Sequence, residues 1–173
     1  EALRDQVNAN LESTISGLAC PETLKKAMSH SVLAGGKRLR PLIVIAASRL
    51  FAEAKIDPMP AACAIEFIHT YSLIHDDLPS MDDAEMRRGR PATHRAFGVA
   101  TGILAADALL MHAFKLVADN GVDAGADGPS VAAAVRDLAT AVGSYGMVGG
   151  QHVDLEVSAV DEIDTETLEY IQT

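Results

Sequence analysis

Aromatic residues are scarce in this chain. Only 4% of its 173 residues are Phe, Trp or Tyr, and Trp is absent. Sheets prefer aromatic and β-branched side chains, whereas an alanine-rich chain that is 49% hydrophobic suits packed helices. Cysteine is also rare: Cys20 and Cys63 lie far apart without C-x-x-C spacing. We therefore expect an all-α protein with buried, reduced thiols rather than a disulfide framework.

Positive charge is in short supply as well. Fourteen Lys and Arg face 24 Asp and Glu, which gives a formal net charge of -10. Such a surface does not attract nucleic acid or anionic lipid. Apolar runs fall short of the roughly 18 residues of a membrane span, since the longest, at 42–47 and 102–111, are short or contain a charge. We expect no nucleic-acid partner and no membrane span.

Apolar residues recur at helical spacing along most of the chain. Leu3, Val7, Leu11 and Ile15 form the stripe of one amphipathic helix over 2–18. The length suits one domain with a sizeable core, so we expect a single helical domain over residues 1–173. Further helices are predicted over 22–33, 42–51 (as an interior helix), 61–77, 95–119, 130–148 and from 165 onwards.

Four carboxylates gather in the segment 76–83, Asp-Asp-Leu-Pro-Ser-Met-Asp-Asp, at the end of the helix predicted over 61–77. Acidic side chains oppose the dipole at a helix C-terminus, so the placement is unfavourable unless a cation compensates it. Carboxylates are ligands that Mg²⁺ prefers, and three arginines follow within 87–90. A solvated charge run is the alternative, but the combination favours a metal-bridged diphosphate.

The spacing of these carboxylates sets a condition. On a regular helix Asp76 and Asp82 would lie about 120° apart and ~9 Å along the axis, too far to share one ion cluster easily. Pro79 between them cannot donate a helical hydrogen bond. The turn must therefore be distorted if both aspartates bind the same metal cluster.

Four segments resemble landmarks of the trans-type polyprenyl diphosphate synthases. Asp76–Asp82 is similar to their first aspartate-rich motif in its form with a two-residue insertion, and Arg87–Gly89 to their arginine pair. Gly35–Pro41 resembles their G-G-K-R-x-R-P segment, and Gly149–Asp154 a further Gly-Gly-Gln-x-x-Asp landmark. Singly these segments also fit a charged loop or a tight helix crossing. Their shared order over about residues 31–156 makes the resemblance specific.

This resemblance implies an isoprenoid-synthase-type bundle of long, mostly antiparallel helices. It implies a Mg²⁺-dependent prenyltransferase that joins isopentenyl diphosphate to an allylic diphosphate, dimethylallyl or geranyl, in a cytoplasmic homodimer. Asp76 and Asp82 would hold Mg²⁺, and with Arg87 they would form the catalytic set. Substrate binding would involve Lys37, Arg40, His69, Arg87, Arg88 and Gln151, with Arg87 on the allylic diphosphate and Lys37, Arg40, His69 and Arg88 on isopentenyl diphosphate.

In this family, residues just upstream of the first aspartate motif set product length. Tyr71 and Ser72 occupy the fifth and fourth positions before Asp76. A ring at the earlier position, together with the inserted motif, resembles bacterial farnesyl diphosphate synthases. We therefore expect a farnesyl product, with geranylgeranyl diphosphate as the alternative.

The family pattern continues with a Lys-Thr pair, a second aspartate-rich motif and a further lysine, which these 173 residues do not contain. We expect the domain to be the N-terminal portion of a larger one, incomplete at the C-terminus, and inactive by itself. Three other readings stay open: a terpene cyclase of the same architecture, a non-catalytic partner subunit, and a plain helical interaction domain. A cyclase has no need for a second diphosphate site.

Overall fold

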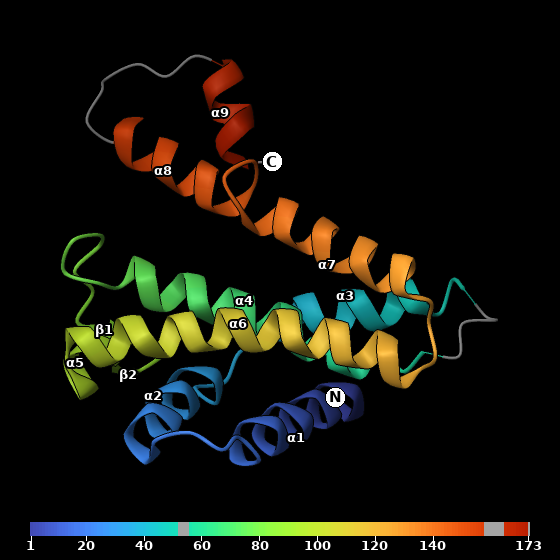
Figure 1. Cartoon of the computed structure of the whole chain (residues 1–173). Coiled ribbons are helices and arrows are strands. Elements are labelled where there is room, and N and C mark those ends of the chain that lie inside the picture. The colour runs from blue at the N-terminus through green and yellow to red at the C-terminus, as the bar shows by residue number, and fades with distance from the viewer. Residues whose placement is uncertain (52–55, 158–164, 173) are drawn as a thin grey trace. The chain divides into compact units, whose positions relative to one another are not determined.

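The computed structural model describes residues 1–51, 56–157 and 165–172 and confirms the predicted all-α class (Figure 1). The chain forms two compact units, residues 1–126 and 127–173, each of which is described by itself. The first unit contains α1 (Ala2–Ser16), α2 (Glu22–Val32), α3 (Leu39–Ser48), α4 (Met59–Asp76), β1 (Met86–Arg87), β2 (Arg90–Pro91), α5 (Thr93–Phe97) and α6 (Val99–Asp123). The second contains α7 (Gly128–Val142), α8 (Met147–Val157) and α9 (Thr165–Gln172).

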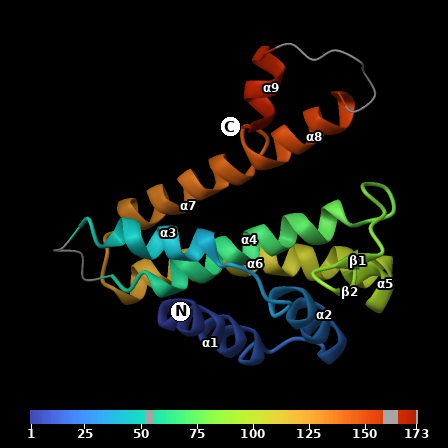
Figure 2. The ribbon, with the colours of Figure 1, turned by 180° about the vertical axis from the view of Figure 1, so that it is seen from behind.

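The core of the first unit lies along the pair α4 and α6, which run side by side in both ribbon views (Figures 1 and 2). Phe67 of α4 and Leu109 of α6 are fully buried, and the small residues Ala105 and Ala106 let the two helices approach closely. Helix α1 contacts this pair through α4, with its predicted stripe buried at Val7, Leu11 and Ile15. This packing fixes the end of α4, where the carboxylates lie.

Helix α6 is the one described helix whose length and composition would allow it to cross a membrane. The core helix of a soluble protein meets the same criteria. Here α6 packs against α2, α4 and α5 and carries Asp107 within its apolar stretch. We therefore interpret α6 as a core helix of the bundle.

Helix α3 departs from the prediction. It begins at Leu39, three residues earlier than expected, and it is not interior: Pro41 and Ile45 are buried, but Ile43 is 66% exposed. The reason is that, among the described elements of the first unit, α3 packs mainly against α4 and more lightly against α1, so a single face is covered. The apolar composition overstated its burial.

Two helices predicted as continuous are interrupted. The segment 95–119 is divided between α5 and α6 at Gly98, whose φ of 86° is open to glycine and strained for other residues. The segment 130–148 ends at Val142, and α8 starts at Met147 after Gly143-Ser144-Tyr145-Gly146, a run with low helix propensity. The hairpin β1–β2 was not predicted at all.

Both cysteines are free thiols, but only Cys63 is buried as expected, since Cys20 is partly exposed. Cys63 is buried in α4, and burial raises its pKa to about 11, with a smaller contribution from Glu66. It is therefore a packing residue rather than a reactive thiol.

Candidate active site

The segment after α4 folds back on the helix end. The Asp82 amide donates a hydrogen bond to the Asp76 carbonyl at 2.9 Å, and the Asp83 amide donates to the Leu78 carbonyl at 3.0 Å. Asp83 takes a left-handed conformation with φ of 48°. The loop thus returns Asp82 to the level of Asp76, which is the distortion that joint metal binding requires.

Asp76 and Asp82 influence each other electrostatically. Burial raises the pKa of Asp76, and the Asp82 and Asp77 carboxylates raise it further, against the opposing effect of Arg87. Within the described part of the chain, neither the Asp76 nor the Asp82 carboxylate forms a hydrogen bond or ion pair with another side chain. Ionised Asp76 is therefore unfavourable in the absence of a cation.

These two carboxylates fit a magnesium ion. Mg²⁺ takes one or two protein carboxylates and completes its octahedron with water and substrate phosphates. The described residues contain no cluster of three or more His, Cys, Asp or Glu side chains arranged around one metal position. Asp76 and Asp82 thus offer a partial coordination set of the kind that a diphosphate completes.

Asp77 has a different environment from its neighbours. Its side chain is 3% exposed, and it accepts hydrogen bonds from Arg87 Nε at 3.0 Å and 3.1 Å and from Arg87 Nη2. This bidentate contact raises the pKa of Arg87, mainly through the hydrogen bond. Asp77 therefore orients Arg87 and is not free to bind a metal.

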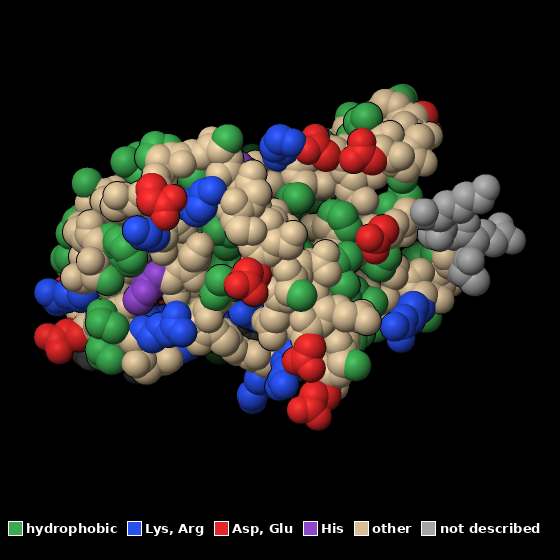
Figure 3. Space-filling view, turned by 90° about the horizontal axis from the view of Figure 1, so that it is seen from below, with side chains coloured by type: hydrophobic (Ala, Val, Ile, Leu, Met, Phe, Trp, Pro, Cys, Tyr) green, Lys and Arg blue, Asp and Glu red, His purple; other side chains and the backbone are tan. Residues whose placement is uncertain are grey.

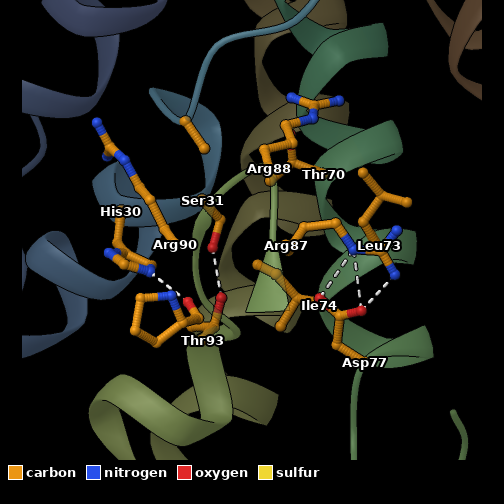
Figure 4. A pocket seen from close by; sticks show the side chains of 12 residues that line it. His30, Ser31, Thr70, Leu73, Ile74, Asp77, Arg87, Arg88, Arg90 and Thr93 are labelled. Carbon is orange, nitrogen blue, oxygen red and sulfur yellow. Dashed lines mark hydrogen bonds and ion pairs between the residues drawn. The ribbon is translucent and has the colours of Figure 1, made fainter. Parts of the chain in front are cut away.

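The two arginines of the predicted pair lie next to each other in a hairpin, Arg87 at the end of β1 and Arg88 in the turn that follows. Arg88 and Gly89 have φ of 51° and 75° and connect β1 to β2, in which Arg87 pairs with Arg90. Positive φ at both central residues is typical of a type I′ hairpin. In Figure 4, Arg87 points to Asp77 on α4, whereas Arg88 points away from it. The two guanidinium groups therefore face different parts of the unit.

Two contacts fasten the hairpin and the start of α5 to α2. His30 Nε2 lies 2.8 Å from the Pro91 carbonyl oxygen, and the Ser31 hydroxyl lies within hydrogen-bond distance of Thr93 (Figure 4). Figure 3 shows basic side chains beside a histidine at the left end of one face, the end at which Figure 1 places the hairpin and α5. The contacts of His30 and Ser31 hold the arginine pair in a fixed position.

A cavity of about 320 Å³ lies on the other side of Arg88, between the segment before α3 and the middle of α4. Arg88 donates from Nη1 to the Gly35 carbonyl, and its Nη2 lies 3.4 Å from His69 Nε2. A Cβ at Gly36 would lie 3.0 Å from Arg88 Nη1, so glycine leaves room for this guanidinium. The cavity is lined by Gly36, Lys37, Arg38, Leu39, Arg40, Glu66, His69 and Arg88.

All four side chains that sequence analysis assigned to isopentenyl diphosphate line this one cavity. Lys37, Arg40 and Arg88 are exposed cations, and Arg38 is paired with Glu66. Burial lowers the pKa of His69, and Arg40 and Arg88 lower it further, against the opposing effect of Glu66. The histidine is thus held neutral next to an excess of positive charge, in a cavity suited to a polyanion such as a diphosphate.

The remaining predicted residues occupy other positions. Tyr71 is half-buried, and its ring contacts His75 edge-on with 4.7 Å between centroids. The Ser72 hydroxyl donates to the His69 carbonyl at 3.0 Å, one turn of helix before Asp76. Gln151 lies on α8 in the second unit, so its part in the site stays a prediction.

Sequence reasoning overlooked Arg38 and Glu66. Arg38 was passed over as one of several basic residues in 37–40, yet it is 3% exposed and paired with Glu66 at 2.6 Å. A lone carboxylate in the apolar helix 61–77 requires a partner, and that requirement was the available signal.

Known proteins resemble this chain over most of its length. The profile of the polyprenyl synthetase family matches residues 21–173. The chain is 50% identical over 139 residues to farnesyl diphosphate synthase of Bacillus subtilis (strain 168), covering 80% of this chain and 47% of that protein. It is 45% identical over 167 residues to the chloroplastic heterodimeric geranylgeranyl pyrophosphate synthase large subunit 1 of Arabidopsis thaliana, covering 95% of this chain and 45% of that protein.

Solved structures show the same architecture. An FPP/GFPP synthase from Zymomonas mobilis superposes with a TM-score of 0.87 at 37% identity, covering 99% of this chain and 63% of that one. A geranyltransferase from Legionella pneumophila gives a TM-score of 0.90 at 33% identity, covering 98% and 60%. The chain spans about half the length of the curated relatives it matches. The match of the family profile over most of the chain, together with these relatives, shows that the chain belongs to the polyprenyl synthetase family.

Proposed function

We propose that this chain supplies the isopentenyl diphosphate site and the first metal-binding aspartates of a prenyltransferase that extends an allylic diphosphate. The observation that carries the proposal is the cavity in which Lys37, Arg40 and Arg88 surround the neutral His69. This second anion site also favours a chain-elongating enzyme over a terpene cyclase. Residues 1–173 would act as one helical part of an all-α prenyltransferase domain.

In the proposed reaction, the bond between the allylic carbon and its diphosphate oxygen breaks first. Asp76 and Asp82 would hold Mg²⁺, which supplies positive charge to the departing diphosphate. Arg87, oriented by Asp77, would donate hydrogen bonds to the same leaving group as its charge develops. The partial burial of Asp76 keeps this part of the site in a lower dielectric, where such contacts are stronger.

Isopentenyl diphosphate would lie in the cavity with its diphosphate on Lys37, Arg40, His69 and Arg88. Its double bond attacks the allylic cation, and a proton then leaves the new cation for the released pyrophosphate. This scheme requires no side-chain nucleophile. The chain's part is to bind two polyanions separately, to align their carbon chains, and to keep water away from the cation. We also propose a cytoplasmic homodimer.

A calorimetric titration tests the proposed function. Isopentenyl diphosphate should bind the chain, and Lys37→Ala/Arg40→Ala should weaken that binding by at least about a hundredfold, since each of the two charged contacts contributes about 1.5–3 kcal/mol. Lys26→Ala/Arg49→Ala removes the same charge from exposed positions outside the cavity and is the matched control. A folded wild-type chain without measurable binding would refute the proposal and favour a non-catalytic subunit.

Product length is the finer part of the proposal. We propose farnesyl diphosphate, because Tyr71 places a half-buried ring at the fifth position before Asp76 and the B. subtilis relative is a farnesyl diphosphate synthase. Geranylgeranyl diphosphate is the second candidate, since the A. thaliana relative is a geranylgeranyl pyrophosphate synthase subunit.

Replacing Tyr71 tests that assignment. Tyr71→Met should lengthen the main product by at least one isoprene unit, because a flexible side chain would open the floor of the pocket. Products are identified by chromatography, in a chain that also carries the family's second aspartate-rich motif. Tyr145→Met, which replaces an exposed tyrosine elsewhere in the chain, is the matched control. Unchanged product length in Tyr71→Met would place the floor elsewhere.

A further inference from the structure

Arg38 connects three helices through one buried guanidinium. Its Nε donates to Asn8 Oδ1 of α1 at 2.8 Å, its Nη1 to Glu66 Oε1 of α4 at 2.6 Å, and its Nη2 to the Val32 carbonyl at the end of α2 at 2.7 Å. The Arg38 and Glu66 side chains are 1% and 3% exposed. The contact is thus a desolvated ion pair extended by two neutral acceptors.

The location of this group relates it to the cavity. Arg38 itself has a left-handed backbone, φ 54° and ψ 35°, immediately before α3. That conformation is unfavourable for a side chain with a Cβ and persists where surrounding contacts enforce it. Lys37 precedes it and Arg40 follows two residues later, both exposed on the cavity. The three bonds of Arg38 therefore fix the backbone from which both cations project.

Glu66, the other member of the ion pair, is also close to a residue of the cavity. Glu66 lies three residues before His69 on α4, and both line the cavity. Arg38 also sits between the α2 end and α4, close to Gly35, whose carbonyl accepts a hydrogen bond from Arg88. The pair thus joins the segment carrying Lys37 to the helix carrying His69.

Arg38 is poorly suited to bind the diphosphate directly. Its charge is matched by Glu66, and its side chain has almost no accessible surface, in contrast to Lys37, Arg40 and Arg88. Stability does not explain the presence of the ion pair either, since a hydrophobic replacement of a buried ion pair is often neutral or stabilising. A requirement to hold the cavity residues in a defined geometry accounts both for the burial of Arg38 and for the presence of a charged pair there.

We infer that Arg38, with Glu66 and Asn8 as its partners, is a positioning residue that sets Lys37, Arg40 and His69 for isopentenyl diphosphate. The inference rests on the proposed function of the cavity. It predicts that the fold tolerates replacement of the ion pair whereas the diphosphate site does not.

The test separates stability from binding. Arg38→Met/Glu66→Leu should unfold within a few degrees of the wild type, because an apolar pair replaces the ion pair. Its calorimetric dissociation constant for isopentenyl diphosphate should rise about tenfold. Arg49→Met removes an exposed arginine just after α3, the helix that Arg38 precedes. It should leave the dissociation constant unchanged. A double variant that binds like the wild type overturns the inference.

Two further variants keep the test decisive. If the double variant does not fold, Asn8→Ala removes one of the three hydrogen bonds of Arg38 and leaves its ion pair with Glu66 in place. Binding of isopentenyl diphosphate should then weaken severalfold. Unchanged binding overturns the inference. Arg38→Lys retains the charge but cannot reach all three acceptors, so it should also bind weakly, and full affinity would assign Arg38 to direct phosphate contact. A wild-type chain that does not bind isopentenyl diphosphate overturns the proposed function itself.

Discussion

Asp76→Asn should be more stable than the wild type at neutral pH, and it should lose its response to Mg²⁺. Burial and the Asp82 charge raise the pKa of Asp76 in the folded chain above its unfolded value. The stability contributed by this carboxyl is therefore fully present below the unfolded pKa and is lost as the pH rises through the folded pKa. An asparagine does not ionise, so it avoids the loss.

The metal provides the second half of this prediction. Mg²⁺ should stabilise the wild type, because it binds the folded chain at the ionised carboxylates. Loss of Asp76 should weaken Mg²⁺-dependent binding of dimethylallyl diphosphate at least as much as the roughly 10–100-fold typical of residues that only support a metal ligand. Thermal unfolding between pH 4 and 8, with and without Mg²⁺, and calorimetry are the measurements.

The control for this experiment is Asp123→Asn, an exposed aspartate at the end of α6. It should leave the stabilisation by Mg²⁺ unchanged. Two results would contradict the prediction: an Asp76→Asn chain less stable than the wild type at pH 7, or one stabilised by Mg²⁺ to the same extent.

Arg87→Met should destabilise the fold by about 3–5 kcal/mol, and Asp77→Asn should cost less, although the two residues share one contact. Asp77 is 3% exposed, so removal of Arg87 leaves a buried carboxylate without a counter-charge. The Arg87 side chain is 38% exposed, and after removal of Asp77 it can turn towards solvent. The asymmetry arises from burial and not from the strength of the bond.

Urea unfolding of both single variants and of Arg87→Met/Asp77→Asn measures this asymmetry. The double variant should recover much of the stability lost in Arg87→Met, because no buried charge remains. Equal costs in the two single variants would contradict the predicted asymmetry, and a larger cost for Asp77→Asn would show that Arg87 is the stranded partner.

The parts of the site that sequence predicted are those written in short contiguous motifs. Lys37 and Arg40 lie in one such motif, and Arg88 follows the aspartate cluster closely, so their residue types indicated phosphate binding before any fold was known. The helices 2–16, 22–32 and 59–76 were likewise predicted nearly to their ends, because their apolar stripes and terminating residues are local.

The parts that could not be predicted depend on contacts between distant residues. Arg38 meets Glu66 across 28 positions and Asn8 across 30, and no local pattern assigns such partners. The same holds for the exposure of α3, which is decided by the neighbours it packs against and not by its own apolar content. The hairpin needs a left-handed backbone conformation at Arg88, and arginine is a residue type that rarely adopts this conformation, so the sequence does not indicate the turn.

The hairpin turn has a consequence for the relative positions of the two proposed substrates. Arg87 and Arg88 are covalent neighbours, yet one is fixed by Asp77 near the aspartates and the other by the Gly35 carbonyl at the cavity. The two residues that would contact the two proposed anions are therefore joined by a single peptide unit, whose Cα–Cα length is fixed. In the proposed function, the allylic diphosphate and isopentenyl diphosphate would therefore bind to adjacent residues of one hairpin.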